Sequence, residues 1–123
     1  MKTTELAHLY KALSEPVHLR IINLLRQQDE LCVCDIITTL SIPQSVISRH
    51  LAYLKKAGLV TSRRQGNWQY YALSLMTPTH PLHYLLEGLT KAFDHCPECT
   101  ADIEMLTKST DNCSITQQKH CVL

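Results

Sequence analysis

The sequence predicts a mainly α-helical domain with one β-hairpin, and three observations carry this expectation. Apolar residues recur at i, i+3, i+4 and i+7 through much of the chain, as on the buried face of amphipathic helices. Prolines and glycines interrupt these stripes at positions suited to the starts and ends of helices. Two short β-prone runs flank a polar turn between the fourth and the last helical stripe.

The helices can be placed in order along the chain. The first stripe ends at Leu13, and Pro16 suits the first turn of the second helix. A third, shorter segment covers residues 31–40. The fourth helix is expected from Pro43 to Ala57, after a break that contains a second proline.

The β-hairpin and the last helix complete the pattern. Gly58 suits the C-terminal position of the fourth helix. The β-prone runs Leu59–Arg63 and Trp68–Leu73 are joined by a turn around Gln65-Gly66-Asn67. A last helix is expected over residues 82–93. The order helix, helix, short helix, turn, helix, hairpin, helix is that of a winged helix-turn-helix.

Positive charge gathers in the middle of the chain, although the net charge is only +1. No Asp or Glu occurs from Ile36 to Leu86, and the basic residues of this segment are Arg49, Lys55, Lys56, Arg63 and Arg64. Carboxylates beside DNA would repel its phosphates, so a segment without acids suits a DNA-facing surface. With 11 acidic residues in 123, we interpret the gap as functional rather than as chance.

The fourth helix is expected to read the major groove of double-stranded DNA. The polar residues on the outer side of its N-terminal half are Gln44, Ser45, Ser48, Arg49 and His50. Glutamine can pair bidentately with adenine and arginine with guanine. The hairpin is expected to reach phosphates or the minor groove as a wing, through Arg63, Arg64, Gln65 and Asn67. We interpret Trp68, Tyr70 and Tyr71 as core rather than as a base-stacking platform.

The terminal helices carry too many apolar residues to be left in water. Two copies packed through them would bury on the order of 1,500 Å², so a homodimer and a palindromic operator are expected. We expect residues 1–95 to form the DNA-binding and dimerisation domain and residues 96–123 to form a Cys-containing tail. No run of about 18 apolar residues predicts a membrane span, and no secretory signal is recognisable, so a cytoplasmic location is expected.

Three runs of sequence together resemble one known family. They are Glu30-Leu31-Cys32-Val33-Cys34-Asp35, then Ser48-Arg49-His50-Leu51 with Leu54, and Gly58-Leu59-Val60 followed by Arg63-Arg64-Gln65-Gly66-Asn67-Trp68. Over roughly residues 5 to 93 the chain resembles the ArsR/SmtB family of metal-responsive repressors, most of all its arsenic-responsive branch. The resemblance implies a dimer that holds its operator without a cofactor and releases it when an inducer ion binds.

Cys32 and Cys34 are the first candidates for binding that ion. A helix N-terminus stabilises thiolates, the form that binds metals, and we expect both residues in the first turn of the third helix. On a regular helix their side chains would point about 160° apart. Two sulfurs that share one ion lie roughly 4 Å apart. We therefore expect ion binding to distort this turn and to shift the DNA-reading helix.

The arsenic-sensor pattern that the chain resembles usually contains a third cysteine, where this chain has Ile36-Ile37. A trivalent arsenical prefers three thiolates, so either two suffice or the third comes from elsewhere in the chain. Cys96 and Cys99 are spaced Cys-x2-Cys and are the second candidate metal ligands. Cys113 and Cys121 are interpreted as tail thiols. Arsenite or antimonite is the expected inducer, with cadmium or another thiophilic ion as an alternative.

Other interpretations are open at this point. A zinc-type site on the last helix would use His83, His95 and Glu98, but Pro81 stands where an acid is needed and the spacing is one residue too long. The same fold could sense redox state through Cys32–Cys34 or Cys96–Cys99 disulfides. A thiol-redox enzyme built on Cys96 and Cys99 would need a βαβ context that the sequence does not predict.

Overall fold

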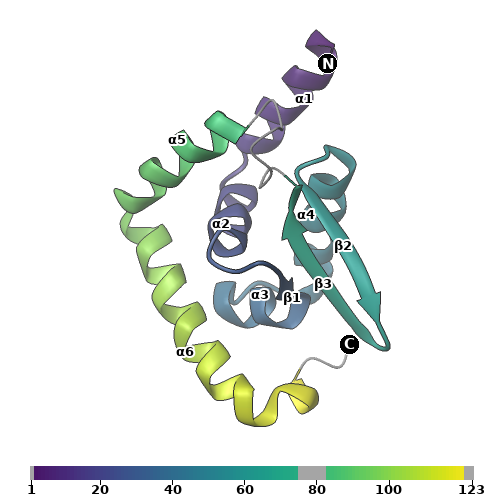
Figure 1. Cartoon of the computed structure of the whole chain (residues 1–123), viewed down its shortest axis with the longest axis vertical. Coiled ribbons are helices and arrows are strands. Elements are labelled where there is room, and N and C mark those ends of the chain that lie inside the picture. Colours follow the sequence, from purple (N-terminus) through teal and green to yellow (C-terminus); the bar gives the residue numbers. More distant parts are fainter. Residues whose placement is uncertain (1, 75–82, 121–123) are drawn as a thin grey trace.

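The structure, a computed structural model, describes the backbone of residues 2–74 and 83–120 and the side chains of residues 2–74 and 83–108. Its helices and strands are, in order, α1 (Thr3–Leu13), α2 (Pro16–Leu25), β1 (Leu31–Cys32), α3 (Val33–Leu40), α4 (Gln44–Lys56), β2 (Val60–Gln65), β3 (Trp68–Leu73), α5 (His83–Asp94) and α6 (Pro97–His120). Helices α2, α3 and α4 form the centre, the sheet lies on one side of them, and α5 and α6 curve along the other (Figure 1).

The core lies between α2, α3 and α4. Ile21 and Leu24 of α2 and Leu51 and Leu54 of α4 have no exposed surface. Fully burying one such side chain stabilises the fold by about 1.5–3 kcal/mol. Pro16 occupies the first turn of α2, and Ser41 with φ 55° ends α3 in the left-handed conformation. These features confirm the predicted helix-turn-helix of α3 and α4, whose bounds differ from the predicted ones by few residues.

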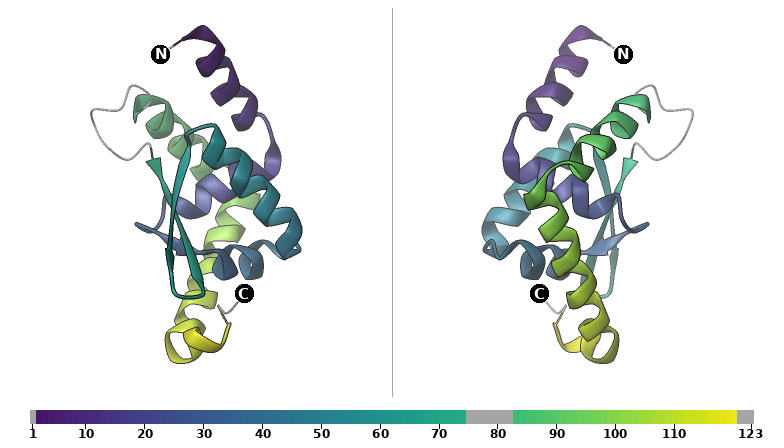
Figure 2. Two further views of the ribbon diagram at one scale, coloured as in Figure 1. Left: turned by 90° about the vertical axis from the view of Figure 1, so that its right-hand side faces the viewer. Right: turned by 90° about the vertical axis from the view of Figure 1, so that its left-hand side faces the viewer.

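The predicted hairpin is confirmed and gains a third strand. Strands β2 and β3 pair antiparallel from Val60 opposite Leu73 to Gln65 opposite Trp68. Gly66, with φ +64°, supplies the left-handed residue of the two-residue turn. Strand β1 adds antiparallel to the other edge of β3, so the order is β1-β3-β2. The hairpin forms a wing on the side of α2, α3 and α4 that faces the viewer in the left view (Figure 2).

Residues 97–120, within the segment expected as a Cys-containing tail, form helix α6. Cys99, Asp102 and Leu106 are 5%, 6% and 1% exposed and lie on one face of this helix. Asp102 also accepts two hydrogen bonds from Arg20 of α2, at 2.8 and 2.9 Å. This face is narrow and includes an aspartate, which explains why the sequence pattern looked polar and weakly periodic.

Two smaller observations concern apolar side chains. Trp68, Tyr70 and Tyr71 are half-buried and pack against the core, as their interpretation as core residues requires. In the described part of the chain, no helix has both the length and the apolar character needed to cross a membrane. Leu82, expected in the last helix, lies outside the described residues.

Candidate nucleic-acid interface and thiol site

Helix α4 divides into a buried and an exposed face. Ile47, Leu51 and Leu54 are buried against the core, which fixes the rotation of the helix about its axis. The four predicted DNA-reading residues that are exposed on the other side are Gln44, Ser45, Ser48 and Arg49. None of their side chains is needed for packing, so this end of α4 can present donors and acceptors to base edges.

His50, the fifth predicted DNA-reading residue of α4, is placed differently. It is half-buried, and its Nδ1 lies 2.9 Å from Nε2 of His18 on α2. Only its remaining ring nitrogen, Nε2, is left for another partner. His50 is therefore held by the helix beneath α4 rather than projecting into solvent like Arg49.

The predicted DNA-contacting residues of the wing lie at the ends of β2 and β3, around the hairpin turn. Arg64, Gln65 and Asn67 are exposed, and Arg64 Nε donates to the carbonyl oxygen of Gly66 at 3.1 Å. Arg63 is exposed too, but its guanidinium makes a bidentate ion pair with Glu30, the residue before β1. The guanidinium also lies 4.6 Å from the centre of the Tyr70 ring. The hydrogen bonds from Arg63 hold the pKa of the Glu30 carboxyl below its ordinary value.

The Glu30 carboxylate competes with DNA phosphates for Arg63, which gives a testable expectation. Glu30→Gln should tighten operator binding and make the slope of log K against log salt more negative by about 0.9 per subunit, because one more cation can neutralise a phosphate. Measuring operator affinity over a series of salt concentrations checks this. Glu104→Gln, the same charge change on an exposed position of α6, is the control. Identical salt slopes for the two variants would contradict the expectation.

The two sulfurs of the Cys-Val-Cys run lie side by side. Cys34 Sγ lies 3.0 Å from Cys32 Sγ, and the two residues are 7% and 3% exposed. Only Cys34 lies on the helix: α3 begins at Val33, and Cys32 is extended at φ −68° and ψ 143°. We expected the side chains of Cys32 and Cys34 to point about 160° apart on one helix, so that a shared ion would distort the turn. This expectation is wrong, because Cys32 is not helical and the 100° rotation per residue does not apply to it.

The Cys32–Cys34 pair lies where the wing meets the helices. The strand register places Cys32 opposite Tyr70 of β3. Cys34 is in the first turn of α3, and α3 contacts α4 directly. A change in the distance between these two sulfurs thus acts on the wing strand and on the support of α4 at once.

Cys96 and Cys99 form a second pair at the start of α6. The backbone N–H and side chain of Cys99 hydrogen-bond to Cys96 and hold the pKa of the Cys96 thiol below its ordinary value. Burial raises the pKa of Cys99 to about 12. The carbonyl oxygen of Cys99 accepts a 3.0 Å hydrogen bond from the buried Asn23 side chain. The Cys96 thiol is therefore the more reactive nucleophile, and the Cys99 thiol is shielded by burial.

The described residues do not join the two cysteine pairs into one larger site. Among the described residues no three His, Cys, Asp or Glu side chains are grouped as a metal site. His83, from the zinc-type alternative, instead lies 3.2 Å from Glu87 Oε1. Cys113 is on α6, with its side chain outside the described residues, and Cys121 lies outside them altogether.

Sequence reasoning missed two residues that position the DNA-reading surface, His18 and Glu30. His18 lies on the buried stripe of α2, three residues before Ile21, and a histidine on such a stripe signals a polar contact inside the core. Glu30 gave no signal of its own, because its partner Arg63 is 33 residues away along the chain.

Comparisons with known proteins agree with this geometry. The family described as "Bacterial regulatory protein, arsR family" matches residues 15–62. Over 84 residues, 68% of this chain and 72% of the relative, the sequence is 39% identical to the arsenic resistance transcriptional regulator ArsR2 of Pseudomonas putida. Over 70 residues it is 47% identical to the arsenical resistance operon repressor of Escherichia coli, of which it spans 60%.

A solved structure extends the similarity to the fold. The homodimeric winged helix-turn-helix DNA-binding domain of a possible ArsR-family regulator from Mycobacterium bovis has a TM-score of 0.62 and 30% identity. The match covers 76% of this chain and 82% of that one. These relatives are regulators of transcription and not enzymes. The chain belongs to the arsR family of DNA-binding regulatory proteins, and α3, α4 and the wing form its winged helix-turn-helix.

Proposed function

We propose that the chain is a homodimeric repressor that releases its operator when Cys32 and Cys34 capture a trivalent arsenic or antimony species. The observation that carries this proposal is the 3.0 Å contact between their sulfurs at the junction of wing and helices. The named relatives that regulate arsenic resistance support the same inducer.

The dimer is supported by apolar surface on the terminal helices. Leu6 and Tyr10 of α1 are 37% and 54% exposed, and Tyr84 of α5 is 77% exposed. Leaving such side chains in water forgoes about 25 cal/mol per Å² of apolar area, which a second copy would recover. The homodimeric structural neighbour agrees with this assembly. Two copies would present two α4 helices to the two halves of a palindromic site.

The chemistry of capture suits a buried thiol pair. Arsenous acid has no net charge at neutral pH, so it avoids most of the desolvation cost that a dication would meet beside Cys32 and Cys34. In the reduced protein each thiol proton leaves with one arsenic-bound hydroxyl as water, and one As–S bond forms in exchange. Two exchanges link both sulfurs to one arsenic and leave one hydroxyl for a third thiol or for solvent.

The transmission step follows from the sulfur separation. Two sulfurs on one tetrahedral ion lie roughly 4 Å apart. Two sulfurs on a pyramidal arsenic lie somewhat closer than that but still farther apart than the observed 3.0 Å, so the pair must open. Cys32 is tied to β3 and Cys34 to α3, so the opening displaces the wing strand and the helix that supports α4. A coupling of about 1–3 kcal/mol would lower operator affinity by roughly 5- to 150-fold.

A second candidate function, redox sensing, is favoured by the unequal thiols of Cys96 and Cys99. Peroxide would oxidise Cys96 to a sulfenic acid with release of water, and Cys99 would displace a second water to form the disulfide. The Cys99 carbonyl oxygen accepts a hydrogen bond from Asn23 of α2. A disulfide at Cys99 would therefore change the contact between α6 and α2.

One experiment separates the two candidates. A duplex selected from random sequence by the reduced protein is labelled, and its release is followed by fluorescence anisotropy. Arsenite under reducing conditions should release the duplex, whereas peroxide without arsenite should leave it bound. Release by peroxide alone, lost in Cys96→Ser, would replace the proposed function by the redox one. Retention of the duplex under both treatments would contradict both.

A further inference from the structure

A second histidine stands behind the DNA-reading helix at a junction of three helices. Nδ1 of His18 lies 2.9 Å from the carbonyl oxygen of Ala12 in the last turn of α1. Nε2 of the same ring lies 2.9 Å from Nδ1 of His50 on α4. His18 is only 4% exposed, so its contact with Ala12 is buried, and its contact with the half-buried His50 is partly buried. One imidazole therefore connects α1, α2 and α4.

The hydrogen positions in this chain of contacts follow from the chemistry of the partners. A carbonyl oxygen only accepts, so the Nδ1 of His18 must carry a proton. In the neutral ring Nε2 of His18 is then an acceptor, and Nδ1 of His50 must be the donor to it. Both neutral histidines are thus held as Nδ1–H tautomers, whereas histidine in water favours Nε2–H. This arrangement leaves Nε2 of His50 as an acceptor beside Arg49.

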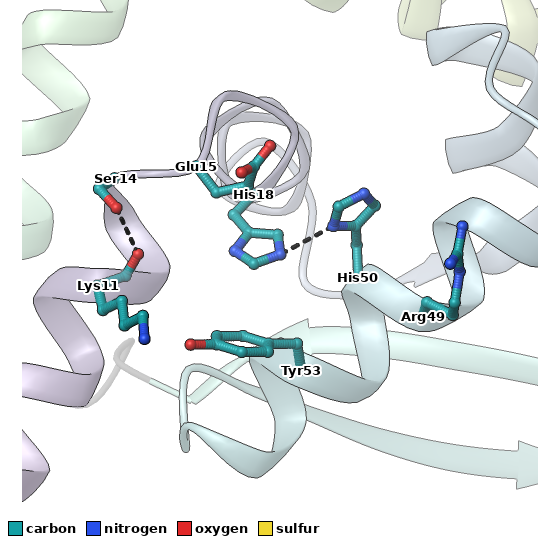
Figure 3. A pocket seen from close by; sticks show the side chains of 7 residues that line it. All are labelled: Lys11, Ser14, Glu15, His18, Arg49, His50 and Tyr53. Atoms are coloured by element: carbon teal, nitrogen blue, oxygen red, sulfur yellow. Dashed lines mark hydrogen bonds between the residues drawn. The ribbon is translucent and has the colours of Figure 1, made fainter.

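The surroundings keep this geometry in place. The Tyr53 ring stacks on His18 with centroids 5.1 Å apart and an interplanar angle of 29°. A cavity of about 450 Å³ opens beside the pair, and its lining is visible at close range (Figure 3). The charged groups that face it are Lys11 from α1, Glu15 from the turn before α2, and Arg49 from α4.

We propose that His18 is a positioning residue for DNA reading, which fixes the ring orientation and tautomer of His50 and through it the seating of α4. Removal of its imidazole leaves the Nδ1–H of His50 without its acceptor and releases α4 from the end of α1. This inference uses the DNA-binding role of the family and does not depend on the thiol chemistry.

Protonation of the His18–His50 pair should make operator binding depend on pH. Burial, and after it the charge of His18, holds the pKa of His50 below its ordinary value. A first added proton fits on Nε2 of His50 and keeps both hydrogen bonds, whereas a second would place two protons between nitrogens 2.9 Å apart. The His50 ring therefore takes up this proton over a range of pH below that of histidine in water. The added charge beside Arg49 favours phosphate, so operator binding should tighten over that range.

The test combines a tautomer measurement with a variant. Long-range ¹H–¹⁵N spectra of the wild type above neutral pH should show the Nδ1–H form for His18 and His50. His18→Leu should return His50 to the Nε2–H form and weaken operator binding about tenfold, the loss of one hydrogen bond in each subunit. His95→Leu, at an exposed position outside α4, is the control.

Two results would overturn the proposal. One is an Nε2–H tautomer for either ring in the wild type, a measurement that stands even if His18→Leu fails to fold. The other is a folded His18→Leu protein whose operator affinity equals that of His95→Leu.

Discussion

Arg49→Ala is expected to weaken operator binding by a factor of roughly 30 to 20,000, the largest loss for any single substitution on the DNA-reading face. Arg49 is exposed on the side of α4 opposite Ile47, and in the structure its side chain is not needed for packing. A bidentate pair with guanine is worth about 1–3 kcal/mol, and a dimer makes the contact twice. The loss should appear in affinity and not in folding.

Operator affinity and dimerisation should therefore be measured on the same samples. Anisotropy titrations give the first and sedimentation velocity gives the second. Lys91→Ala removes the same charge from an exposed position on α5 and serves as the control. Equal affinity for both variants would refute the role assigned to Arg49, and loss of the dimer would show that Arg49 acts elsewhere.

Asp102→Ala should lower the free energy of unfolding by about 3 kcal/mol, because it leaves the Arg20 guanidinium without its partner inside the fold. Asp102 is 6% exposed and accepts from Nε and Nη2 of Arg20. The Arg20 side chain keeps 23% of its surface exposed, so some water remains and the cost lies at the low end for a broken buried pair. The same contact joins α6 to α2.

A second arginine–aspartate contact of the fold supplies the control. Arg26 lies 3.1 Å from Asp94, whose side chain is 63% exposed. Asp94→Ala should cost about 0.5 kcal/mol, as for surface ion pairs in general. Urea denaturation at one fixed protein concentration measures both variants, since dimerisation makes stability depend on concentration. Equal midpoints for Asp94→Ala and Asp102→Ala would show that α6 is not anchored by the ion pair.

The parts of the fold that the sequence predicts are those set by local patterns. The stripe of Ile47, Leu51 and Leu54 defines α4 and therefore the outward side of Arg49. Gly58 and Gly66 mark a helix end and a tight turn, because both adopt positive φ. Each of these features is determined by residues that are close together in the sequence, so it can be predicted without knowing the fold.

The features that escaped prediction depend on contacts between distant segments. Strand β1 has two residues, too few for an alternating pattern, and exists because β3 pairs with it. That pairing keeps Cys32 extended and brings its sulfur to Cys34, which helix geometry alone would forbid. Helix α6 likewise depends on Arg20, 82 positions before Asp102.

In the proposed function, release of the operator originates at the sulfurs of Cys32 and Cys34. Operator affinity is to be measured under reducing conditions, with and without arsenite, for the wild type and for the doubly substituted Cys32→Ser, Cys34→Ser protein. The wild type should lose roughly 5- to 150-fold in affinity with arsenite, and the variant should bind equally well in both conditions. Full release of the variant by arsenite would contradict the account and assign sensing to other cysteines.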